Sequence, residues 1–186
     1  NVKSSLLGTV CNYVNGERRA TTNTTLPMPQ FYDIVKELSD SNTENCVMEV
    51  SSHGLKQNRV FGVRYKGACF TKFFRDHIGP KDHPTMEDYF MSKMKIFDVS
   101  EYAVINADCA NADNVIEYAR NAGCKVITYG IKGTADCSAT SIERAMVNGS
   151  HGSRFTVSSP WYNGDVEVGM LGEFNIYNAL LAIAVA

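Results

Sequence analysis

Short runs of apolar and β-branched residues alternate along the chain with segments whose apolar residues recur at three- and four-residue spacings. The runs predict buried strands, and the spaced segments predict helices that pack one face on a sheet. Alternation of strand and helix is typical of an α/β fold with a doubly wound, mostly parallel sheet. The predicted strands are 5–10, 46–50, 68–73, 102–107 and 125–131, and the predicted helices are 30–38, 86–97 and 114–122.

The pattern changes after Ser138. Residues 154–157 and 165–170 alternate as antiparallel strands do, and Asn148-Gly149-Ser150 and Asn163-Gly164-Asp165 have the composition of turns. We therefore predict a small antiparallel β piece near the C-terminal part, followed by an apolar helix over 175–186. That helix has no closing signal, and Asn1 stands just before the first strand, so we expect residues 1–186 to be one domain cut at both ends.

Composition and charge narrow the classes of partner. The 186 residues are 44% hydrophobic and 20% charged, which is typical of a globular protein, and the net charge of −2 comes without a basic run that would bind nucleic acid. No apolar run is long enough to span a bilayer, and the residues near Asn1 do not have the charged-then-apolar pattern of a secretion signal. Six cysteines without a C-x-x-C pair predict reduced, mostly buried thiols. We expect a cytoplasmic monomer that binds neither nucleic acid nor membranes.

The segment Val47 to Leu55 delivers the carboxylate of Glu49 from an apolar strand directly into a polar loop. In open parallel sheets, ligands collect at the carboxyl ends of strands, where a carboxylate can hold Mg²⁺ near phosphates. His77 follows the next predicted strand, so the two side chains can converge and offer a divalent ion one oxygen and one nitrogen. A solvated strand end followed by a serine turn is the alternative.

Several motifs together resemble the central domain of the Mur ligases, the ATP-dependent amide-bond-forming enzymes of peptidoglycan synthesis. They follow the family's order over nearly the whole chain, and the branch that makes UDP-N-acetylmuramoyl-tripeptide matches best. The segment 78–84 departs from the family's commoner sequence. The matching pieces are Leu7-Gly8-Thr9, Thr22 to Thr25, Met48 to Leu55 with Gln57 and Arg59, Phe70-Thr71, Arg75-Asp76-His77, Met86 to Lys93, Val104 to Asp108 and Gly172 to Asn178.

The resemblance implies a P-loop NTPase-like fold and a role for each matching residue. Glu49, His77 and Lys93 would be catalytic and would serve Mg²⁺, and Lys93 would be carbamylated. The UDP-muramoyl substrate would be bound by Thr24, Thr25, Ser51, Gln57 and Arg59, and ATP would be approached by Asn175 and Asn178. Each has a simpler alternative: a hydrogen-bonding His, a solvated Lys, threonines in turns and an Asn that caps a helix.

Carbamylation of Lys93 would require a neutral amine. Carbamylation turns a cation into an anion with carboxylate-like oxygens, and the reaction needs a neutral amine. The site should therefore lower the pKa of Lys93 by burial or through nearby cations.

The phosphate-binding sequence G-x-x-x-x-G-K-[ST] does not occur between residues 1 and 186. In the family that loop lies just upstream of the matching region, so we expect the chain alone to be inactive. Gly130 to Thr134 is expected to be only a turn after a strand.

The full-length protein is thus expected to add an amino acid to UDP-N-acetylmuramoyl-L-Ala-D-Glu with ATP and Mg²⁺. A folylpolyglutamate synthase or another Mur ligase is one alternative, although Ser51 to Gly54 with Gln57 and Arg59 favours the tripeptide branch. A non-catalytic module that binds muramoyl nucleotides is another.

Overall fold

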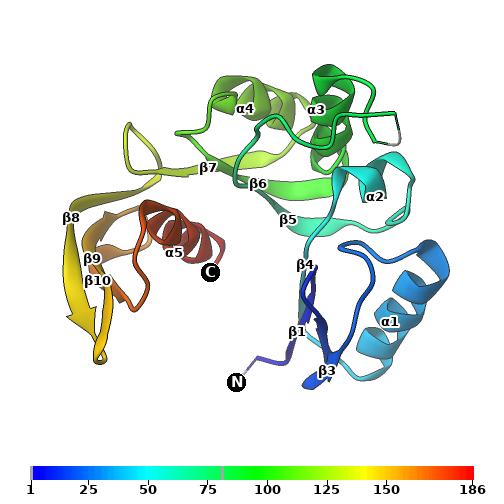
Figure 1. The fold of residues 1–186 in the computed structure, drawn as a ribbon, viewed down its shortest axis with the longest axis horizontal. Helices are drawn as coiled ribbons and strands as arrows, with labels where there is room; N and C mark the ends of the chain where they lie inside the picture. Colours follow the sequence, from blue (N-terminus) through cyan, green and yellow to red (C-terminus); the bar gives the residue numbers. More distant parts are fainter. Residues whose placement is uncertain (1, 81) are drawn as a thin grey trace. The chain divides into compact units, whose positions relative to one another are not determined.

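The computed structural model describes residues 2–80 and 82–186 and divides the chain into two compact units (Figure 1). The first comprises Asn1–Val63 and Asp76–Lys95, and the second comprises Arg64–Arg75 and Ile96–Ala186. Within the described ranges, no helix has the length and apolar character needed to cross a membrane.

The first unit contains a four-stranded sheet in the order β3-β2-β1-β4. Strands β1 and β4 are parallel, whereas β2 pairs antiparallel with both β1 and β3. Asn15 and Gly16 form the turn between β2 and β3 with φ of 54° and 86°, the left-handed conformations that a tight hairpin requires. The strands are β1 (Ser4–Leu7), β2 (Asn12–Val14), β3 (Glu17–Arg19) and β4 (Asn45–Met48).

Helices α1, α2 and α3 belong to the described part of the first unit (Figure 1). Helix α1 (Met28–Asp40) buries Phe31 and Leu38. Helices α2 (Ser52–Lys56) and α3 (Met86–Met94) contact each other, and each begins with a side-chain cap. The Ser51 hydroxyl accepts from Gly54 N, and the Thr85 hydroxyl accepts from Asp88 N, both at 3.0 Å. The caps fix where both helices start.

The second unit contains a six-stranded sheet in the order β10-β9-β8-β7-β6-β5. Strands β5 to β8 run parallel, and β8, β9 and β10 pair antiparallel. The 3₁₀ turn η1 (Phe97–Val99) precedes β6. The strands are β5 (Tyr65–Phe70), β6 (Ser100–Asn106), β7 (Lys125–Gly130), β8 (Cys137–Val147), β9 (Ser150–Ser158) and β10 (Asn163–Val168).

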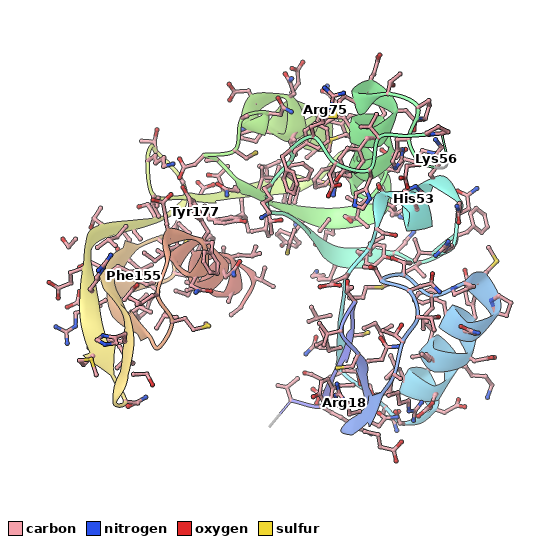
Figure 2. All side chains as sticks on the ribbon, in the orientation of Figure 1. Arg18, His53, Lys56, Arg75, Phe155 and Tyr177 are labelled. Atoms are coloured by element: carbon pink, nitrogen blue, oxygen red, sulfur yellow. The ribbon has the colours of Figure 1, made fainter. Side chains whose placement is uncertain are left out.

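Helices α4 (Ala112–Asn121) and α5 (Glu173–Val185) pack against this six-stranded sheet. The core beneath α5 joins Val104 of β6 and Phe155 of β9 to Ile176 and Leu180 of the helix. Figure 2 shows the labelled Phe155 on the strands that face α5. The antiparallel strands therefore share a core with the parallel ones.

The α/β class with parallel strands and an antiparallel C-terminal piece is confirmed. The parallel strands, however, lie in two sheets, and the long strand β8 was not predicted. The turn predicted at Asn163-Gly164-Asp165 is wrong, because these residues belong to β10. The chain instead turns where the Ser159 hydroxyl accepts from Tyr162 N at 2.9 Å, so a serine side chain and not the Asn-Gly pair sets the turn.

Burial also differs from expectation at the predicted strand 46–50. Strand β4 is an edge strand of its sheet, and Val47 is 63% exposed. All six cysteines are free, but Cys46 and Cys69 are exposed and Cys109 is half-buried, so the predicted burial holds for Cys11, Cys124 and Cys137. The same apolar pattern occurs in central strands and in edge strands, so the burial of such a segment depends on which strands pair with it.

Candidate functional site

A polar pocket of about 490 Å³ lies in the first unit, within the size range of small-molecule sites. Every predicted site residue of the first unit lines this pocket, although these residues lie far apart in the sequence. The predicted residues that line it are Thr24, Thr25, Glu49, Ser51, Gln57, Arg59, His77 and Lys93.

Glu49 stands one residue beyond β4, and its carboxylate is held through one oxygen. Thr9 N donates to Glu49 Oε2 at 2.7 Å, and the Thr9 hydroxyl donates to the same oxygen. That hydroxyl also lies 3.0 Å from the hydroxyl of Thr24. Thr9 therefore links the predicted metal-binding carboxylate to a predicted substrate-binding threonine.

His77 has a left-handed backbone, with φ of 55°. Its N–H donates to Asp76 Oδ1 at 2.8 Å, and its side chain is 51% exposed. The ring makes edge contacts with His53 and Tyr89, at centroid distances of 5.9 and 5.7 Å. The imidazole is thus held by aromatic neighbours while remaining open to the pocket.

Lys93 is on the last turn of α3, and its Nζ lies 5.3 Å from the centre of the Tyr89 ring. Burial lowers the pKa of Lys93 from its ordinary value, and the negative charge of Asp76 opposes this shift only in part. Because burial disfavours the charged form, the fold favours the neutral amine that carbamylation needs.

The hydroxyls of Thr25 and Ser51 make hydrogen bonds with the backbone. Buried Thr25 donates from Oγ1 to Glu49 O at 3.2 Å and accepts from Ser51 N at 2.9 Å. Ser51 caps α2 through its own hydroxyl. Both hydroxyls are therefore used in local hydrogen bonds to the backbone, as the simpler alternatives of a turn and a helix cap predict. These hydrogen bonds fix the loop that follows Glu49.

Gln57 and Arg59 pair with each other at the end of α2. Gln57 Oε1 accepts from Arg59 Nε at 2.9 Å and from Nη2 at 2.7 Å, and Arg59 Nη1 donates to Thr25 O at 2.8 Å. The guanidinium is thereby oriented at the wall of the pocket.

Sequence reasoning missed several residues of the pocket wall, among them His53, Asp82 and Tyr89. Burial, together with the neighbouring His83, lowers the pKa of His53, whose Nε2 lies 3.3 Å from Asp82 Oδ1. The available signal was that three of the four histidines of the chain fall between positions 53 and 83.

Asn175 and Asn178 belong to the second unit and have different surroundings. Asn175 is buried and donates from Nδ2 to Leu171 O at 2.8 Å, at the start of α5, whereas Asn178 is exposed. The structure therefore does not present the two amides as one shared surface.

Asp108, also in the second unit, holds the turn that follows β7. Its Oδ2 accepts from Ile131 N at 2.6 Å, from Lys132 N at 3.1 Å and from the Tyr177 hydroxyl at 2.9 Å. This acceptor role raises the pKa of Tyr177, although burial is the larger cause. Gly130 to Thr134 is thus a turn fixed by a carboxylate, as expected.

Among the described residues, no group of three His, Cys, Asp or Glu side chains is placed to hold a metal ion. Mg²⁺ commonly takes only one or two carboxylates from a protein and completes its octahedron with water and substrate phosphates. The oriented carboxylate of Glu49 fits a Mg²⁺ that is shared with a bound phosphate ligand.

Comparison with known proteins agrees across the chain. Residues 2–186 match the model of the Mur ligase middle domain. The protein named "UDP-N-acetylmuramoyl-L-alanyl-D-glutamate--2,6-diaminopimelate ligase" of Clostridium perfringens is 33% identical over 98% of this chain. Its namesake from Bacillus cereus is 35% identical over 98% of the chain. The chain spans 37% of the length of each of these relatives.

Solved structures agree with the sequence matches. A structure with the same ligase name superposes over 100% of this chain and 37% of its own, with a TM-score of 0.85 at 29% identity. MurF from Acinetobacter baumannii shares the fold over 77% of this chain and 31% of its own, with a TM-score of 0.64 at 21% identity. The chain belongs to the Mur ligase middle domain family.

Proposed function

We propose that this chain is the central domain of an ATP-dependent ligase that adds an amino acid to UDP-N-acetylmuramoyl-L-Ala-D-Glu in peptidoglycan synthesis. The observation that carries the proposal is the pocket of the first unit, which gathers Glu49, His77 and Lys93 with the predicted substrate residues. The relatives' names give 2,6-diaminopimelate as the added amino acid, so it is the first amino acid to test.

In the proposed reaction, the substrate carboxylate attacks the γ-phosphate of ATP and releases ADP. The amine of the amino acid then attacks the acyl phosphate, forms the amide bond, loses a proton and expels phosphate. A bound Mg²⁺ supplies charge neutralisation at the transferred phosphoryl group. Glu49 and His77 would hold it, Arg59 and Gln57 would orient the nucleotide sugar, and Thr24, Thr25 and Ser51 would form the substrate-binding wall of the pocket.

Lys93 is proposed to be carbamylated. Its neutral amine would add to CO₂, forming a carbamate and releasing one proton, and the carbamate would supply carboxylate-like oxygens to the pocket that Lys93 lines. The lowered pKa of Lys93 supports this step. Asn175 and Asn178 are proposed to approach ATP from α5, with Asn178 the more accessible of the two.

The protein is proposed to be a cytoplasmic monomer whose partners are the muramoyl nucleotide, ATP and the amino acid. The net charge of −2 supports the absence of nucleic-acid and membrane partners.

Calorimetric titration of the full-length protein with UDP-N-acetylmuramoyl-L-Ala-D-Glu tests the proposal, with UDP-glucose as the control ligand. Arg59→Ala should weaken binding by about tenfold to 150-fold, because a charge-assisted hydrogen bond contributes about 1.5–3 kcal/mol. Arg18→Ala is the matched control, because Arg18 is exposed on β3 and does not line the pocket (Figure 2). Equal affinity for both ligands, or equal loss in both variants, would reject the proposed substrate.

A further inference from the structure

His83 is a fully buried histidine whose two ring nitrogens both have polar partners. Nδ1 lies 2.5 Å from Asp88 Oδ2 on α3, and Nε2 lies 2.9 Å from the Ser52 hydroxyl on α2. Because a carboxylate only accepts, Nδ1 is the donor to Asp88. Lys56 Nζ lies 2.6 Å from the same carboxylate oxygen and completes the arrangement. The His83 side chain thus ties α2 to α3.

The backbone of His83 makes a second connection, to the segment that carries His77. His83 N donates to His77 O at 3.0 Å, and Gly79 N donates to His83 O at 3.1 Å. The ring also packs on His53 and Tyr89, with centroids 4.6 and 5.1 Å away. One buried residue therefore fixes the His77 carbonyl relative to both helices.

His77 needs such support because of its backbone conformation. Of the described non-glycine residues with positive φ, all except His77 and Ser141 are asparagines. Histidine, like asparagine, is enriched in this conformation, but the left-handed region still costs free energy, and hydrogen bonds from neighbouring residues help to hold it.

The order Ser52, His83, Asp88 has the connectivity of a hydrolytic triad. Burial decides against that chemistry, because a nucleophile must meet its substrate and Ser52 is only 4% exposed beside the fully buried His83. Of the three residues, Ser52 lines the pocket, whereas His83 and Asp88 do not, so the imidazole supports the pocket wall from behind.

We infer that His83 is a positioning residue that holds His77 at the metal region by joining its backbone to α2 and α3. The inference rests on the proposed function, in which His77 holds the divalent ion. It assigns a purpose to His83 and Gly79, which lie in the part of the sequence that departs from the family's commoner pattern.

The test is titration of the full-length protein with Mn²⁺, with free Mn²⁺ followed by electron paramagnetic resonance. His83→Leu removes both side-chain contacts while filling the space, and it should raise the Kd for Mn²⁺ about tenfold, as loss of residues that orient metal ligands commonly does. His83→Gln, which keeps an amide donor for Asp88, should raise it less. The number of sites per total chain should not change.

That separation distinguishes positioning from folding, because misfolded chains lower the number of sites and leave the Kd of the remainder unchanged. His151→Leu, at an exposed histidine of β9, is the matched control and should leave both values unchanged. An unchanged Kd in His83→Leu alongside a raised Kd in His77→Ala would overturn the inference and leave the proposed function standing.

Two further outcomes complete the design. If the parent protein has no Mn²⁺ site, or if His77→Ala leaves the Kd unchanged, the metal role of His77 fails and the inference falls with it. If His83→Leu does not fold, Ser52→Ala and Asp88→Ala each remove one side-chain contact of His83. A raised Kd in either supports the inference, and an unchanged Kd in both overturns it.

Discussion

Thr9 is the residue on which the orientation of Glu49 depends. Thr9→Val keeps the backbone donor to Oε2 but removes the hydroxyl that joins Glu49 to Thr24. We expect the Mg²⁺ concentration for half-maximal activity of the full-length protein to rise about threefold to tenfold, because an orienting partner of a metal ligand is lost. Thr9→Ser should retain the parent value.

Thr22→Val is the matched control for Thr9→Val, because Thr22 is exposed and outside the pocket wall. A similar shift in both variants would show that the effect does not pass through Glu49.

A second prediction at the residue scale concerns the pH dependence of Lys93 carbamylation. Because burial lowers its pKa, Lys93 is deprotonated at a lower pH than an exposed lysine, and protonation at acid pH removes the amine that reacts with CO₂. In ¹³C-labelled bicarbonate, the carbamate resonance of Lys93 should appear at a lower pH than the carbamate resonances of surface amines. Lys93→Arg should abolish it, whereas the exposed neighbour Lys95→Arg should not. Persistence in Lys93→Arg would contradict the assignment.

At the scale of elements, the loop that bears Glu49 is fixed by close packing between α2 and Thr25. A Cβ on Gly54 would lie 2.8 Å from Thr25 Cγ2 and 2.9 Å from Thr25 Cβ. Gly54→Ala should therefore lower the free energy of unfolding by about 1–3 kcal/mol, because overpacking outweighs the better helix propensity of alanine. Pulse proteolysis in urea measures this loss in the full-length protein.

Gly133→Ala is the control for that substitution, since a Cβ there meets nothing within 4 Å. It should be nearly neutral. Equal stability of Gly54→Ala and the parent would mean that α2 and Thr25 separate without cost.

At the scale of the whole molecule, the second unit depends on the core beneath α5. Leu180 is fully buried there, and Leu180→Ala should cost about 2–5 kcal/mol through lost burial and the cavity left behind. Phe174 on the same helix is 66% exposed, so Phe174→Ala should change stability by less than about 0.5 kcal/mol. Hydrogen exchange of α5 peptides compares the two variants. Equal protection of α5 in Leu180→Ala and Phe174→Ala would show that Leu180 does not belong to the core that holds the helix.

Much of the architecture was predictable because it depends on local pattern. The helices over 30–38 and 114–122 have apolar residues at helical spacing; α1 includes the first range, and α4 includes the second up to Asn121. Strand β8 was not predicted, because most of its length contains no apolar run. The strand is recognised only by its pairing with β9 and β7. The two-sheet arrangement likewise depends on pairing, which no single segment specifies.

The sequence by itself determined the set of candidate residues and their family, because the order of motifs along a chain needs no folding to be recognised. Only the tertiary structure decided how those residues are held. Thr9 and Glu49 are 40 positions apart, and Ser52 and His83 are 31 apart. A hydrogen bond requires its two atoms within about 3 Å. Folding alone brings such partners together, so the supports of Glu49 and His77 could not be predicted from local pattern.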